Sequence, residues 1–157
     1  MSISKVTDYF ESVHLKDRIM EFTQSSATVE LAAIAVGCEP KQIAKTLSFI
    51  VNDKPILIVV AGDARIDNKK FRTFFHQKAK MIPWDDVESY TGHAPGGVCP
   101  FAVNPDVFTY LDVSLKRFPV IYPAAGSASS AVRLSPDELE VHAGPIAWID
   151  VCRDWKM

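Results

Sequence analysis

The chain has 157 residues, of which 48% are hydrophobic and 23% are charged, and this composition suits one soluble domain with one core. The formal net charge of −2 argues against a protein that coats nucleic acid through bulk positive charge, but it leaves a local contact with an RNA end open. No apolar run approaches the roughly 20 residues of a membrane helix. Residues 1–8 also lack the basic start and apolar stretch of a signal peptide. We therefore expect a cytoplasmic protein with no membrane partner.

The cysteines and histidines lack the spacing of a metal site. The three cysteines and four histidines are scattered along the chain, with no Cys-x-x-Cys motif and no closely spaced histidine pair. An odd number of cysteines without a secretion signal also argues against a disulfide framework. We therefore expect neither a metal nor disulfides.

Helices are predicted from apolar spacing and from capping residues. Residues 4–14 have apolar side chains at helical spacing, which predicts an amphipathic helix. Thr28 is the cap of a second predicted helix, which ends at Gly37. Pro40, at a first helical position, begins a short helix that leads into Lys45.

Two strands are predicted after this short helix. Residues 47–51 and 56–61 are apolar runs of strand length, separated by turn-forming residues at 52–55. The second run is continuously apolar, so we expect it to be buried on both faces.

Two more helices are predicted before the second half of the chain. Asp67 can cap a helix that buries Phe71, Phe74 and Phe75. A short helix is predicted at 85–90.

The second half is predicted to be mostly strands. Ser135 and Glu138 flank Pro136 and form a capping box, which predicts one helix start there. The strands are too unevenly spaced for a regular βαβ repeat, so we expect a mixed α/β domain. Strands are predicted at 98–103, 108–111, 120–123, 131–134 and 146–151.

Lys45 lies where the short helix is expected to meet the strand at 47–51. A lysine at such a junction is either a solvated cation or a fixed positive charge that faces a pocket. Most lysines are solvated, so the residue alone favours the first interpretation.

Two segments rich in small residues are candidate ligand sites. Gly96 and Gly97 allow close approach of a ligand, and their N–H groups can bind an oxyanion, but an ordinary turn explains them equally well. Residues 124–130 form either a flexible loop or the floor of a tight pocket. Neither segment contains a P-loop or a Gly-x-Ser-x-Gly nucleophile elbow.

The acidic and thiol side chains have ordinary explanations as well. Asp63, Asp67 and Asp112 are candidates for acid–base chemistry, but we interpret Asp63 and Asp67 as a helix cap or partners in surface ion pairs. Cys99 is a candidate nucleophile, although an isolated cysteine is more often a small buried hydrophobe.

Taken in order, these segments resemble the YbaK/prolyl-tRNA-editing family. The resemblance covers residues 28–151, and it depends on the order of the motifs more than on any one of them. The motifs are TVELAA at 28–33, then 37–39, KQIAKTL at 41–47, 62–63, 91–92, GGVCPF at 96–101, 111–112 and 126–127.

The resemblance implies a single editing domain over 1–157, with a mixed, curved sheet flanked by helices. It implies that Lys45 is the catalytic lysine and that no cofactor is needed. It also implies a set of substrate-binding residues, in which the backbone of the glycine loop holds the substrate carbonyl. That set is Thr28, Gly96, Gly97, Val98, Asp112, Gly126 and Ser127.

The implied activity is that of a trans-acting aminoacyl-tRNA deacylase, which removes a small amino acid from the acceptor end of a mischarged tRNA and so protects translation fidelity. The attacking group is a water molecule or the substrate's own thiol. Prolyl-tRNA synthetase is a further expected partner, and DNA is not expected. One alternative is a non-catalytic module that binds aminoacyl-tRNA or prolyl-tRNA synthetase, and another is a hydrolase of an unrelated small ester. Cys99 stands where relatives often have serine or threonine, which leaves the amino-acid preference open.

Overall fold

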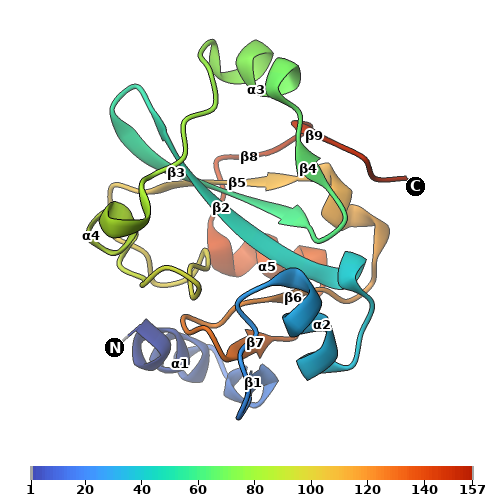
Figure 1. Ribbon diagram of the computed structural model, residues 1–157. Helices are drawn as coiled ribbons and strands as arrows, with labels where there is room; N and C mark the ends of the chain where they lie inside the picture. Colours follow the sequence, from blue (N-terminus) through green and yellow to red (C-terminus); the bar gives the residue numbers. More distant parts are fainter. Residues whose placement is uncertain (1, 157) are drawn as a thin grey trace.

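A mixed five-stranded sheet forms the centre of the protein, in the strand order β6-β2-β3-β5-β8 (Figure 1). The computed structural model describes residues 2–156. Strands β2 and β3 are antiparallel, whereas every other neighbouring pair in this sheet is parallel. The strands are β2 (Ile43–Val51), β3 (Lys54–Ala61), β5 (Phe108–Asp112), β6 (Tyr122–Pro123) and β8 (Ala147–Ile149).

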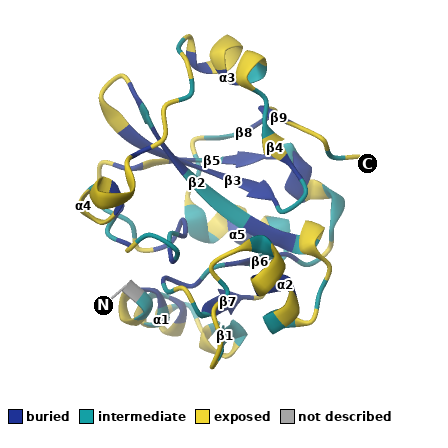
Figure 2. Cartoon of the chain, viewed as in Figure 1, coloured by how far each residue is buried: buried dark blue, intermediate teal, exposed yellow. Residues whose placement is uncertain are grey.

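The hairpin of β2 and β3 is the longest pairing in the sheet. Asn52 and Asp53 form its turn with φ values of 53° and 63°, a conformation that these two residue types tolerate well. Strand β3 is buried from Pro55 to its end, as its dark blue colour in Figure 2 shows. The prediction of a strand buried on both faces is therefore confirmed.

Five α-helices surround this sheet. Their ends follow from local chemistry: the side chain of Thr28 caps α2, Asp67 caps α3, and Ser135 forms a complete capping box with Glu138 at the start of α5. Helix α1 lies at one end of the molecule and α3 at the other (Figure 1). The helices are α1 (Ser2–Ser12), α2 (Val29–Val36), α3 (Asn68–Phe75), α4 (Val87–Thr91) and α5 (Pro136–Ala143).

Short elements complete the fold. Strand β1 (Ile19–Glu21) pairs with β7 (Ser130–Val132), and β4 (Arg65–Ile66) pairs with β9 (Cys152–Arg153), each antiparallel. The sequence did not predict β1, β4 or β9. The 3-10 segments are η1 (Lys16–Arg18), η2 (Pro40–Gln42), η3 (Trp84–Asp86) and η4 (Val113–Arg117).

A main core joins the sheet to α1, α3 and α5, and a smaller cluster of Ala32, Ala33 and Ile43 packs α2 against β2. Phe10 of α1 is fully buried and meets Phe101 edge-on, with ring centroids 4.9 Å apart. At the other end, Phe71 of α3 packs against Phe49 of β2. The result is one compact α/β domain with a curled sheet, as expected.

Three expectations about local structure were wrong. Residues 98–103 form a loop instead of a strand: Pro100 has no N–H for a ladder, and Ala102 has a φ of 52°. Strand β2 begins at Ile43, so Lys45 lies inside the strand opposite Val60 and not at a helix junction. Phe74 is 44% exposed because only its neighbours at positions 71 and 75, one helical turn apart, share the buried face.

No helix among residues 2–156 has both the length and the apolar character that crossing a membrane requires.

Candidate functional site

A pocket of about 580 Å³ opens on the middle of β2. Residues 45–47 of this strand are only half-buried, unlike most of their neighbours, because the pocket lies against them. Four other parts of the chain complete the wall: residues 26–32 at the start of α2, residues 81–87, the loop at 95–98, and residues 122–131. Most of the lining is apolar or small, and within the described chain it contains no His, Cys, Asp or Glu.

Lys45 joins this pocket to a second one of about 670 Å³. The second pocket is more polar, with Glu30, Asp63 and Arg65 in its wall. Lys45 lies in the lining of both. Its side chain is half-buried, and within residues 2–156 it makes no ion pair with a carboxylate. Burial lowers the pKa of Lys45 from the ordinary lysine value, because removal from water penalises the charged form.

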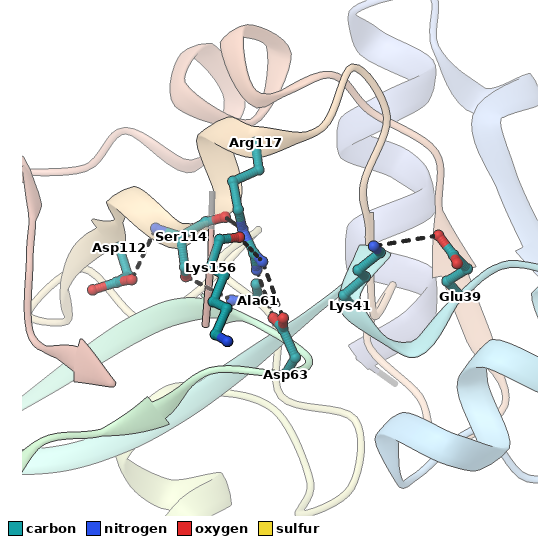
Figure 3. A network of polar contacts seen from close by, with 8 residues as sticks. All are labelled: Glu39, Lys41, Ala61, Asp63, Asp112, Ser114, Arg117 and Lys156. Carbon is teal, nitrogen blue, oxygen red and sulfur yellow. Dashed lines mark hydrogen bonds and ion pairs between the residues drawn. The ribbon is translucent and has the colours of Figure 1, made fainter. Parts of the chain in front are cut away.

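The carboxylate of Asp63, in the second pocket, is held by Arg117 (Figure 3). Arg117 Nη1 donates to Asp63 Oδ2 at 3.0 Å, and Nη2 donates to the other oxygen, so the pair is bidentate. Arg117 also donates to the carbonyl oxygens of Ser114 and Lys156, which fixes its guanidinium. The hydrogen bond from Arg117 lowers the pKa of Asp63. The negative charge of Asp63 is therefore largely committed to Arg117, and it leaves Lys45 unpaired.

The glycine loop contributes two residues to the pocket wall, Gly96 and Val98. Gly96 has a φ of 88°, a conformation that favours glycine. Gly97 turns away from the pocket, and a Cβ on it would lie 2.7 Å from Ser127 Cα. The N–H of Gly97 donates to Ala94 O at 3.0 Å. Gly97 therefore lets two loops approach each other, and its N–H is occupied, whereas those of Gly96 and Val98 make no hydrogen bond within the described chain.

The small-residue segment lies behind this loop. Ala124 and Ser130 line the pocket, but Gly126 and Ser127 do not. Ser127 donates from its hydroxyl to Ser130 Oγ at 2.8 Å and accepts from the N–H of Ser129. The segment is thus an ordered turn that positions Ser130 and supports the glycine loop.

The other expected site residues are divided between the pocket and the core. Thr28 lines the pocket at the start of α2, where its hydroxyl accepts from Leu31 N. Asp112 is fully buried and belongs to neither pocket. Its two oxygens accept from the N–H groups of Val151 and Ser114, both at 3.0 Å, which ties β5 to the C-terminal segment.

The structure adds pocket residues that the sequence did not single out. Thr46 lines the pocket with a buried hydroxyl that has no hydrogen-bond partner in the described chain. Met81 and Trp84 form part of the rim. Only the position of Thr46 inside the 41–47 motif pointed to it, and nothing local marked the other two.

Cys99 is buried outside the pocket, 3.5 Å from His93 Nε2. Desolvation raises the pKa of Cys99 to about 12, so the thiol is protonated at neutral pH. No group of three metal-ligating side chains exists among residues 2–156.

The curled sheet thus places Lys45, which has no ion pair, between an apolar pocket and a polar one. Such a site suits a ligand that has both an apolar group and a polar or anionic group. The chain belongs to the aminoacyl-tRNA editing domain family, whose model matches residues 23–141. The expected family resemblance is therefore confirmed.

Similar proteins agree with this assignment. The chain is 49% identical to the uncharacterized protein YwhH of Bacillus subtilis (strain 168), over 99% of this chain and 100% of YwhH. It is 26% identical, over 81% of this chain and 79% of the relative, to a protein of Enterococcus faecalis (strain ATCC 700802 / V583) named "Putative Cys-tRNA(Pro)/Cys-tRNA(Cys) deacylase EbsC". A solved structure described as "a putative trans-editing enzyme for prolyl tRNA synthetase" superposes with a TM-score of 0.86 at 29% identity, over 97% of each chain. Family and relatives together support a role in aminoacyl-tRNA editing.

Proposed function

We propose that the protein is a trans-acting deacylase that hydrolyses the ester between a small amino acid and the acceptor end of a mischarged tRNA in the cytoplasm. One observation supports this most strongly: the half-buried, unpaired ammonium of Lys45 between an apolar and a polar pocket. An unpaired cation that is partly removed from water is costly unless a ligand uses it. The polyanionic, hydroxyl-rich end of a tRNA supplies such a partner.

The chemistry needs few protein groups. In the proposed reaction a water oxygen bonds to the ester carbonyl carbon, the bond to the ribose oxygen breaks, and that oxygen takes up a proton. Gly96 and Val98 line the pocket, and their N–H groups make no hydrogen bond within residues 2–156, so we expect them to donate to the carbonyl oxygen. An aminoacyl ester is already reactive, so positioning and oxyanion stabilisation can supply much of the rate.

The amino-acid pocket favours a small side chain because Ala27, Ala32 and Ala124 lie in its wall together with Gly96. One methylene in an apolar pocket is worth about 1–3 kcal/mol, so selectivity should be graded, at roughly 10- to 200-fold per group. The test is release of amino acid from a panel of mischarged tRNAs that carry cysteine, alanine, serine, valine and phenylalanine. We expect turnover with one or more of the first three, and equal cleavage of the alanyl and phenylalanyl esters would contradict the proposal.

A second candidate is a non-catalytic module that binds aminoacyl-tRNA or prolyl-tRNA synthetase. The described lining of the 580 Å³ pocket contains no His, Cys, Asp or Glu, and this favours the alternative. The same panel separates the two functions. Tight binding of charged tRNA with no acceleration of hydrolysis over the protein-free rate supports the binding module.

A further inference from the structure

The rim of the 580 Å³ pocket has two large apolar side chains that are open to solvent. Trp84 is 71% exposed and Met81 is 56% exposed, and both line the pocket. A single exposed apolar residue needs no special explanation. Here two such residues line one pocket, and one of them is an indole, whose flat apolar face can contact a ligand.

Backbone hydrogen bonds hold this rim firmly against β2, the strand that also carries Lys45. Met81 forms an isolated antiparallel bridge with Phe49. Ile82 N donates to Ser48 O at 3.1 Å, so the segment is attached three residues along the strand from Lys45. At about 3.4 Å per residue, this attachment lies roughly 10 Å from Lys45. A rigid platform therefore stands at a fixed distance from the proposed reaction centre.

The volume of the pocket exceeds what a small amino acid requires. Sites of about 300–1,000 Å³ take drug-sized ligands, and this pocket measures about 580 Å³. A small amino acid joined to a nucleoside has that size. The pocket can thus accommodate the base and ribose of the substrate in addition to the aminoacyl group.

The charges around the rim favour a base over a phosphate at this position. Asp85 and Asp86 follow Trp84 directly and would repel a phosphate. Lys45 and Arg65 line the adjoining polar pocket, where a phosphate would be attracted. An uncharged, flat group is therefore the best fit for Trp84.

We propose that Trp84, supported by Met81, is the platform on which the terminal adenine of the tRNA stacks while the amino acid enters the pocket. Stacking of unpaired bases on aromatic side chains is the usual way in which proteins hold single-stranded RNA ends. This assignment rests on the proposed deacylase function and makes Trp84 a substrate-positioning residue. Trp84 contributes affinity for the base, while the chemistry takes place at the ester near Lys45.

The test compares the Trp84→Ala and Trp84→Phe variants with wild type on two small substrates, a 3′-O-aminoacyl adenosine and the matching aminoacyl ribose without a base. For the adenosine ester we expect Trp84→Ala to raise KM about tenfold, equivalent to about 1.4 kcal/mol, with kcat within about twofold. Trp84→Phe should remain within about threefold of wild type because it keeps an aromatic face. For the ribose ester, all three proteins should have the same KM.

Val141→Ala is the matched control, because Val141 is equally exposed at 71% but lies on α5 outside the pocket. An unchanged KM in Trp84→Ala with the adenosine ester, or an equal loss with the ribose ester, would overturn the stacking assignment. If wild type cleaves neither ester, the deacylase proposal is decided by the panel of mischarged tRNAs, and stacking is measured separately by binding of an uncharged RNA microhelix. Trp84→Ala should bind the intact microhelix about tenfold more weakly than wild type and should match wild type when the terminal base is absent. Equal binding of the intact microhelix by the two proteins would refute the platform.

Discussion

Replacement of Lys45 by methionine removes the charge but keeps an unbranched apolar chain of similar length. In the proposed reaction the ammonium of Lys45 makes charge-assisted hydrogen bonds to the substrate, and such bonds contribute about 1.5–3 kcal/mol each. Because the side chain is already half-buried without a carboxylate partner, little further desolvation opposes those bonds. We therefore expect Lys45→Met to lower kcat/KM at least about tenfold and up to roughly 150-fold.

Lys45→Met should not lose stability, although it should lose activity. Burial lowers the pKa of Lys45 in the folded state, so the unfolded chain binds more protons in the window between the two pKa values, and stability rises with pH there. Below that window the charged form is present in both states and carries its full desolvation penalty in the folded state. Lys45→Met should consequently unfold at the same temperature as wild type or higher, as expected for a residue kept for function.

The assay pairs amino-acid release from mischarged tRNA with thermal unfolding followed by circular dichroism. Lys45→Arg serves as a second variant that retains the charge. We expect it to rescue activity only in part, because a planar guanidinium does not occupy the place of a compact ammonium. Full activity in Lys45→Met would refute the proposed role. A large drop in unfolding temperature with lost activity would show instead that Lys45 supports the fold.

Four other substitutions test the parts around Lys45. Gly97→Ala should lower the free energy of unfolding, measured by chemical denaturation, by about 1–3 kcal/mol, because its Cβ would clash with the facing backbone. Gly96→Ala should lower it by only about 1 kcal/mol, because of the positive φ at this position. Equal losses in the two variants would contradict the division of roles in this loop. Cys99→Ser should keep most of the deacylation rate, since the thiol is buried and protonated, and complete loss with the fold intact would indicate covalent thiol chemistry. Arg117→Ala should cost about 1–3 kcal/mol at pH 7 by releasing Asp63. Because the pKa of Asp63 is lowered in the folded state, the stability that this carboxylate contributes is lost as pH falls through its folded-state pKa. The difference in unfolding free energy between wild type and Arg117→Ala should therefore be smaller at pH 3 than at pH 7. A difference that stays constant with pH would argue against the ion pair.

The ends of the helices could be predicted because local chemistry determines them. Thr28 and Ser135 satisfy the first N–H groups of their helices from within the same few residues, and Gly37 takes the left-handed conformation that ends α2. No distant partner is needed for these signals. Each appears in the structure at the predicted position.

Strand boundaries depend on partners far along the chain, and here the predictions from sequence were less accurate. Strand β2 begins at Ile43 because Ile43 and Ala44 pair with Tyr122 and Pro123, about 80 residues away. The residues at 98–103 are apolar but do not form a strand, since Cys99 and Phe101 are buried from a loop. Apolar character thus indicated burial correctly without fixing the backbone conformation.

The candidate site was also predicted only in part from the sequence. Lys45, Gly96 and Val98 were expected from ordered motifs, and the fold brings them to one pocket. Met81 and Trp84 could not be predicted, because their place at the rim is set by hydrogen bonds from residues 80–82 to β2. Periodicity within their own segment gives no sign of this contact.

Substrate choice in such a site depends on which groups are left without a partner. The described lining of the apolar pocket contains no His, Cys, Asp or Glu, so we expect it to select substrates by the space it offers next to the glycine loop. In the polar pocket Asp63 is committed to Arg117, so the cations available to a ligand there are Lys45 and Arg65. Every tRNA has the same terminal nucleoside and phosphates, and contacts to them give affinity without selectivity. The attached amino acid differs between charged tRNAs, and it is the part that would enter the apolar pocket. In the proposed function, discrimination between amino acids therefore falls to the small residues of this pocket, and we expect Lys45 to act equally on every tRNA whose amino acid fits.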